Sequence, residues 1–186
     1  MEQQGFQSEQ PPNAKPEEGT GTDREVIERK NVVLHAMETY GRLTHWPDAI
    51  PNDPNTLKEA ETIIERAQAT VGTQKEYFRT INGILKEASE NPDTYADHPE
   101  ILKRVMWSGL VAANERARQT VLDYDERKIT KEHLSSQRQA AYDDARSVLD
   151  RFRKFLDRDT IQTILDSFHR SVPPENDYLI HLRVFS

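Results

Sequence analysis

The sequence contains no cysteine, so it can form no disulfide bond and offers no thiolate to zinc, to an iron–sulfur cluster or to nucleophilic catalysis. It also has no apolar run approaching the roughly 18 residues that a membrane-spanning helix needs. Its first ten residues, MEQQGFQSEQ, lack the basic and apolar segments of a secretory signal. We therefore expect a cytoplasmic protein that does not enter a membrane.

The chain has no excess of basic residues. It carries 25 Lys and Arg against 32 Asp and Glu, which gives a formal net charge of −7. Neutralisation of phosphates by Lys and Arg dominates the affinity of proteins for nucleic acid. The charge balance therefore argues against a nucleic-acid partner.

No catalytic or cofactor-binding motif is present either. The sequence has no phosphate loop, dinucleotide fingerprint or nucleophile elbow, and its six histidines never form an HExxH pattern. The nearest approach to the Glu-x-x-His sets of metal-binding bundles is His35 with Glu38 and Asp166 with His169, each three residues apart. We expect all four on the surface, and we predict no enzyme activity, no cofactor and no metal.

What the chain does have is helical periodicity. It is 35% hydrophobic and 31% charged, with a mean hydropathy of −0.85, which is typical of long amphipathic helices with solvated outer faces. Apolar residues recur at steps of three and four in five segments, which predict helices at about 22–41, 55–90, 99–128, 131–156 and 159–172. The prediction is an all-α, antiparallel bundle of four long helices and a short fifth.

The ends of the chain have a different composition. Residues 1–21 are rich in Gln, Glu, Gly and Pro with one aromatic, which predicts a disordered tail. The helical bundle domain is expected over residues 22–172. The remaining residues, 173–186, follow two prolines and are predicted to form an extended segment.

Helix ends are predicted from capping residues and glycine. Thr22 with Glu25 has the spacing of a capping box, and Gly41 fits a C-terminal stop. Further N-caps are expected at Asp53, Asp97, Thr130 and Asp159.

The second predicted helix keeps a seven-residue register. Counted from Leu57, the apolar series runs Leu57, Ala60, Ile64, Ala67, Val71, Gln74, Phe78, Ile81, Leu85 and Ala88. This spacing favours packing against other helices at about 20°, as in coiled coils. Gly72 leaves open whether residues 55–90 form one helix or two. Gln74 and Arg138 interrupt apolar stripes, and we expect their side chains to extend into water.

The C-terminal segment alternates with the period of a β-strand. Tyr178, Ile180, Leu182 and Val184 fall on one face, and no partner strand exists in the chain. The segment could pair with a second copy or with the sheet edge of a partner. The alternative is that it lies extended over the bundle or is disordered, with Leu182 or Phe185 filling a groove.

These patterns predict a non-enzymatic, self-associating protein-interaction module, which could be an adaptor, an assembly subunit or a scaffold. The alternative is a helical-bundle enzyme or ligand-binding protein with an interior polar site, formed for example by His35, Glu38, Asp166 and His169. Two tryptophans and the C-terminal segment supply the candidate interaction residues: Trp46, Trp107, Tyr178, Ile180, Leu182, Val184 and Phe185.

Overall fold

The computed structural model describes residues 20–47 and 53–183, and all regular secondary structure in these residues is helical. The all-α prediction is therefore confirmed for this part of the chain. The six α-helices are α1 (Thr20–Thr44), α2 (Pro54–Val71), α3 (Gln74–Glu90), α4 (Pro99–Asp125), α5 (Lys131–Phe152) and α6 (Arg158–Ser171). Two short 3₁₀ helices are also present: η1 (Pro92–Tyr95) lies between α3 and α4, and η2 (Pro174–Asn176) follows α6.

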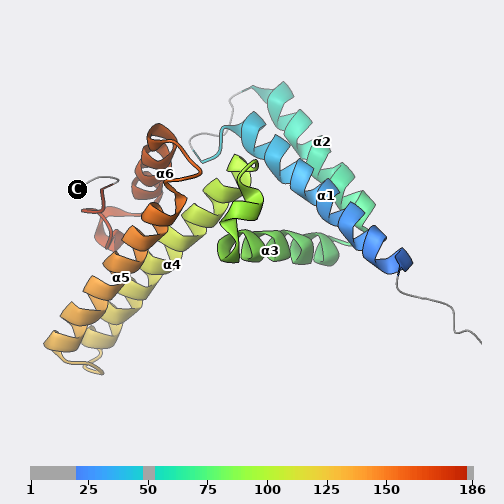
Figure 1. Cartoon of the computed structure of the whole chain (residues 1–186). Helices are drawn as coiled ribbons and strands as arrows, with labels where there is room; N and C mark the ends of the chain where they lie inside the picture. The colour runs from blue at the N-terminus through green and yellow to red at the C-terminus, as the bar shows by residue number, and fades with distance from the viewer. Residues whose placement is uncertain (1–19, 48–52, 184–186) are drawn as a thin grey trace, which may run out of the picture.

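The helices form two antiparallel pairs rather than one aligned bundle (Figure 1). α1 packs most closely with α2, and α4 packs most closely with α5. The two pairs diverge, and α3 crosses beside α1 and α4 where they meet (Figure 1). An antiparallel four-helix bundle is thus not confirmed, although α1 lies beside α2 and α4 lies beside α5.

Large apolar side chains from α4, α5 and α6 form the centre of the core. Ile101, Leu110, Leu149 and Phe168 are each at most 1% exposed. Gly109 lets α4 and α5 approach closely, because a Cβ at this position would lie 2.9 Å from a methyl carbon of Val148. The stripes predicted on these helices therefore do face the core.

A turn at Gly72 and Thr73 separates α2 from α3, so residues 55–90 form two helices. Gly72 has a φ of 112°, which L-residues with a side chain rarely adopt. Thr73 then starts α3 with a capping box: its hydroxyl accepts a hydrogen bond from the Glu76 N–H, and the Glu76 carboxylate accepts one from the Thr73 N–H. Two local signals thus end one helix and begin the next.

The break also moves the buried face of the second half. In α2 the small residues Ala60 and Ala67 of the heptad series are buried, as predicted. In α3 the buried residues are Tyr77 and Ile84, one position before the series, together with Ala88 of the series. Phe78 is 51% exposed. After Gly72 the series is therefore buried at Ala88 but not at Phe78, and most of the buried face lies one position earlier. Gln74 lies exposed in the first turn of α3, and Arg138 is exposed on α5.

Several predicted boundaries are corrected. α1 begins at Thr20 rather than Thr22 and continues past Gly41 to Thr44. Gly41 instead allows close packing, because a Cβ there would lie 3.0 Å from the Cβ of Glu100. Val26 and Ile27, expected to be buried, are 63% and 57% exposed because the first turns of α1 are solvated.

Of the N-caps predicted for the other helices, two are confirmed and two are wrong. Asp53 accepts hydrogen bonds from two backbone N–H groups of α2, and Thr130 accepts one from α5, as predicted. α6 is capped by Asp157 rather than Asp159. α4 has His98 at its N-cap with no side-chain bond, so the cap predicted at Asp97 is wrong.

The C-terminal residues 177–183 form turns, and the strand prediction is wrong for them. Leu179 and Leu182, three residues apart, are both 1% exposed, whereas Ile180 is 46% exposed. Side chains three apart share a face in a turn but not in a strand, so the alternation does not describe the structure. Leu182 fills a site on the helical body, as the alternative proposed.

Some predictions concern residues outside the described ranges. These are most of the tail predicted for residues 1–21, together with Val184 and Phe185. Among residues 20–47 and 53–183, no helix combines the length and apolarity needed to cross a membrane.

Candidate functional site

The structure brings both tryptophans of the chain to one cavity of about 400 Å³. The cavity lies where the α1–α2 pair meets α3 and α4, and we call it the aromatic pocket. Side chains from these four helices and from the turn after α1 line it: Met37, Tyr40, Trp46, Ile64, Gln68, Tyr77, Phe78, Ile81, Leu85, Arg104, Trp107 and Ser108.

The two tryptophans contact one another. Their ring centroids lie 5.5 Å apart at an interplanar angle of 63°, an edge-to-face arrangement that aromatic rings prefer. Trp107 also meets Phe168 of α6 edge-to-face at 5.8 Å. Because Phe168 is buried, this contact connects the wall of the pocket to the rigid core. Trp46 and Trp107 are both half-buried, with part of each ring open to the pocket or solvent.

Among the described residues, Arg104 is the one cation that lines the aromatic pocket. Its guanidinium carbon lies 4.9 Å from the ring centroid of Trp46 and 5.7 Å from that of Tyr40. Such cation–π contacts stabilise a charge without neutralising it. The Arg104 Nε–H is buried and donates to no acceptor in the described part of the chain. Burial lowers the pKa of Arg104 below its usual value, with the carboxylate of Glu100 opposing the change.

Tyr77 contributes a second donor to the pocket. Its side chain comes from α3 and is 2% exposed, yet its hydroxyl has no hydrogen-bond partner among the described residues. Burial raises the pKa of Tyr77, and the positive charge of Arg104 acts in the opposite direction. The Tyr77 hydroxyl therefore stays protonated near neutral pH and can donate.

Contacts behind the pocket hold its walls in place. Glu38 of α1 accepts a hydrogen bond from the Ile101 N–H at 3.2 Å and so caps α4 from outside, which replaces the missing cap at its start. The Glu38 side chain is 13% exposed, and burial raises its pKa. On the other side, Glu87 of α3 accepts hydrogen bonds from Lys30 at 2.5 Å and from Tyr95 at 3.0 Å.

Three of the four residues of the alternative polar site have separate partners, and the fourth, His35, is exposed on α1. Glu38 caps α4, Asp166 accepts a hydrogen bond from Gln162, and His169 turns to Asp177. In the described residues, no group of three or more His, Asp or Glu side chains is placed to hold a metal ion. The spacing of Asp166 and His169 along α6 therefore does not correspond to a joint site.

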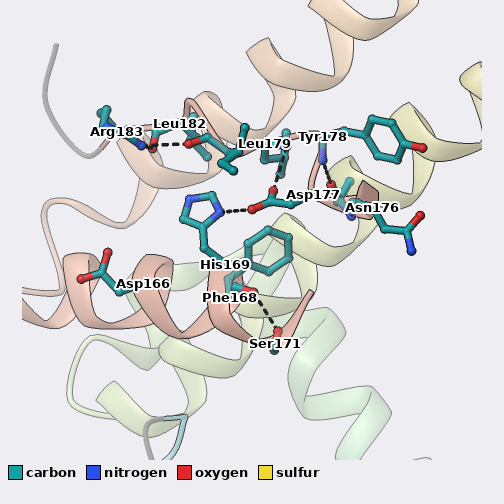
Figure 2. A network of polar contacts seen from close by, with 12 residues as sticks. Asp166, Phe168, His169, Ser171, Asn176, Asp177, Tyr178, Leu179, Leu182 and Arg183 are labelled. Carbon is teal, nitrogen blue, oxygen red and sulfur yellow. Dashed lines mark hydrogen bonds and ion pairs between the residues drawn. The ribbon is translucent and has the colours of Figure 1, made fainter. Parts of the chain in front are cut away.

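The pair of His169 and Asp177 anchors the C-terminal segment to α6 (Figure 2). The His169 Nδ1 lies 2.6 Å from an Asp177 carboxylate oxygen, and the other oxygen accepts the Leu179 N–H at 3.0 Å. Asn114 of α4 adds a further attachment, because its amide oxygen accepts the Tyr178 N–H at 2.9 Å. The His169 Nε2 is buried and has no hydrogen-bond partner among the described residues, so the ring is hydrogen-bonded to Asp177 alone, and this pair attaches the segment to α6.

The C-terminal candidate residues do not join the aromatic pocket. Tyr178 lines a different hollow beside α5, where the guanidinium of Arg138 lies 5.9 Å from its ring centroid. Leu182 is buried, and of the described candidates in this segment Ile180 alone is mainly exposed. The structure thus unites Trp46 with Trp107 and separates them from the rest.

Of the residues that line the aromatic pocket, the sequence analysis named only Trp46 and Trp107 as candidates for interaction. Among those that it missed, Phe78 was assigned to the apolar heptad series, and no pattern marked Tyr77 or Arg104 as a site residue. The signal that was available is Gly72 followed by the capping-box spacing of Thr73 and Glu76. It predicts a new helix at residue 74, and therefore a new orientation for Tyr77 and Phe78.

Comparisons of the chain with protein-family models, with curated proteins and with solved structures found no match.

Proposed function

We propose that this chain is a non-enzymatic interaction module, serving as an adaptor, assembly subunit or scaffold, and that the aromatic pocket binds a partner protein. The observation that supports this is an apolar cavity whose rim residue Phe78 is 51% exposed. Exposed apolar surface costs roughly 25 cal/mol per Å² relative to burial. A partner side chain that fills the cavity removes this cost, and aromatic residues are common at the energetic centre of interfaces.

The position of both tryptophans makes the proposal directly measurable. Because the chain has only Trp46 and Trp107, its tryptophan emission reports on the aromatic pocket alone. Short random peptides displayed on phage would be selected on the full chain, and the binders then titrated by emission. We expect the selected peptides to share an apolar anchor and to change the emission on binding.

Two matched variants test whether these peptides occupy the pocket. Phe78→Ser removes an exposed apolar side chain at the rim, whereas Leu122→Ser removes one that is 38% exposed near the far end of α4. We expect Phe78→Ser to weaken peptide binding about tenfold or more, and Leu122→Ser to leave it unchanged. Peptides that bind both variants equally well, or a selection without binders, would contradict the proposal.

Self-association, a cytoplasmic location and the lack of a nucleic-acid partner are further parts of the proposal. Val26 and Ile27 are adjacent, exposed and apolar on α1, and a second copy could cover them. Sedimentation equilibrium would measure the oligomeric state, cell fractionation the location, and retention on heparin the affinity for polyanions. The net charge of −7 supports weak retention.

A further inference from the structure

We propose that the aromatic pocket recognises a carboxylate, carried as an Asp or Glu side chain next to the apolar anchor of the partner protein. This inference rests on the proposed function and adds the chemistry of the partner to it. The occupant is then an acidic, apolar protein segment.

The first argument is that two hydrogen-bond donors line one apolar cavity without an acceptor. The Arg104 Nε–H and the Tyr77 hydroxyl are both buried, and neither has a partner in the described residues. A buried donor left unpaired destabilises the folded state relative to a donor that is paired. The two donors come from different helices, α4 and α3. A ligand group with two acceptor oxygens could form a hydrogen bond with each of them.

The second argument is that neither nearby carboxylate pairs with Arg104. Glu38 accepts the Ile101 N–H. One oxygen of Glu100 accepts a hydrogen bond from Lys103 at 2.7 Å, and the other faces Gly41 of α1, buried and without a hydrogen-bond partner among the described residues. These charges attract Arg104, but no ion pair with it is formed among the described residues.

The third argument is the setting of the guanidinium. The guanidinium carbon of Arg104 lies 4.9 Å from the ring centroid of Trp46 and 5.7 Å from that of Tyr40, and such aromatic contacts restrict the positions that the guanidinium can take. A guanidinium restricted in this way in an apolar environment favours a carboxylate over a neutral amide, because charge-assisted bonds are about twice as strong as neutral ones. The rest of the lining, including Ile81 and Leu85, suits an aliphatic or aromatic side chain beside that carboxylate.

The test compares an acid with its uncharged amide of the same shape. 4-Phenylbutyrate and 4-phenylbutanamide would each be titrated into the full chain, and binding followed by protein NMR shifts and tryptophan emission. Because hydrogen bonds to a charged group are stronger than those to a neutral one, we expect the acid to bind about tenfold or more tightly. In Arg104→Gln this preference should disappear, and in Tyr77→Phe it should fall partway with the ring retained.

Controls separate this inference from the proposed function. Phe78→Ser should weaken acid and amide equally, because it removes apolar contact and leaves both donors. Equal binding of acid and amide to the wild-type chain, with both lost in Phe78→Ser, would overturn the carboxylate while keeping the pocket. If both probes bind Phe78→Ser as tightly as they bind the wild-type chain, the aromatic pocket is not the binding site. Tyr77→Phe, which keeps the shape of the core, remains informative if Arg104→Gln fails to fold.

A final arm identifies the source of the carboxylate. Each acidic residue in the peptides selected on the pocket would be replaced by its amide, Asp by Asn and Glu by Gln. A loss of about tenfold at one such position, absent in Arg104→Gln, is expected for a protein partner. If the small acid shows the preference and no peptide does, the ligand is a small amphiphilic acid, and a protein partner is overturned.

Discussion

Two glycines inside helices should respond in opposite ways to replacement by alanine. In a helix interior alanine is favoured over glycine by about 0.5–1 kcal/mol, because glycine loses more backbone entropy on folding. A Cβ on Gly83 of α3 would meet no atom within 4 Å. Gly83→Ala should therefore stabilise the protein by about 0.5–1 kcal/mol.

The same replacement at Gly109 meets α5. A Cβ there would lie 2.9 Å and 3.0 Å from the two methyl carbons of Val148, whereas carbon atoms pack favourably at about 3.5–4.0 Å. Rotation of a β-branched side chain cannot withdraw both methyls, so α4 and α5 must separate. Overpacking of this kind costs about 1–3 kcal/mol, which exceeds the gain in helix propensity, and we expect a net loss of about 1 kcal/mol.

Urea denaturation followed by circular dichroism measures both effects. With an m value of about 1–3 kcal/mol/M, the two variants should shift the midpoint in opposite directions by roughly 0.5 M each. Val148→Ala in the Gly109→Ala background supplies the control, because removing the methyls should relieve the clash and give a favourable coupling of about 0.5–3 kcal/mol. If Gly109→Ala stabilises as much as Gly83→Ala does, or if the double variant is additive, the close packing described for α4 and α5 is refuted.

Three further predictions concern caps, pH and association. Thr73→Ala removes the hydroxyl that caps α3 and should lower the free energy of unfolding by about 1 kcal/mol in urea. Because burial raises the pKa of Glu38, its ionisation costs stability as the pH rises above the ordinary value of about 4. Glu38→Gln keeps an acceptor, so its stability relative to wild type should increase as the pH rises from about 4 in thermal melts, whereas a constant difference would refute this. Serine at both Val26 and Ile27 should shift any oligomer toward monomer in sedimentation, and an unchanged mass would exclude this face.

The sequence predicted the helical class and much of the core, because periodicity at steps of three and four is a strong local signal. The apolar stripes of α4 and α5 show this: Leu102, Leu110 and Leu149 are buried as expected. Caps with a clear side-chain acceptor before a helix, such as Asp53 and Thr130, were also found. These features depend on residues close together in the chain.

What the sequence did not predict depends on contacts between distant segments. The cap of α4 comes from Glu38, 63 residues before Ile101, so no local pattern could point to it. The C-terminal residues alternate in hydrophobicity, but His169 and Asn114 hold them in turns by bonds to Asp177 and Tyr178. A short alternating run determines a strand only where a neighbouring strand accepts its backbone bonds, and the chain offers other partners here.

The turn at Gly72 and the aromatic pocket are one feature of the molecule. On a single straight helix, Ile64 and Leu85 would lie about 32 Å apart at the standard rise, too far to line one cavity. Both line the aromatic pocket, because the left-handed backbone of Gly72 ends α2 and the capping box of Thr73 starts α3 in a new direction. The same turn moves Tyr77 into the core side of the pocket and leaves Phe78 on its rim. An uninterrupted heptad helix would have hidden its apolar stripe against one neighbour, whereas the broken one exposes part of that stripe around a hollow that contains an arginine. That physical difference is why we assign binding to this site rather than to the ends of the chain.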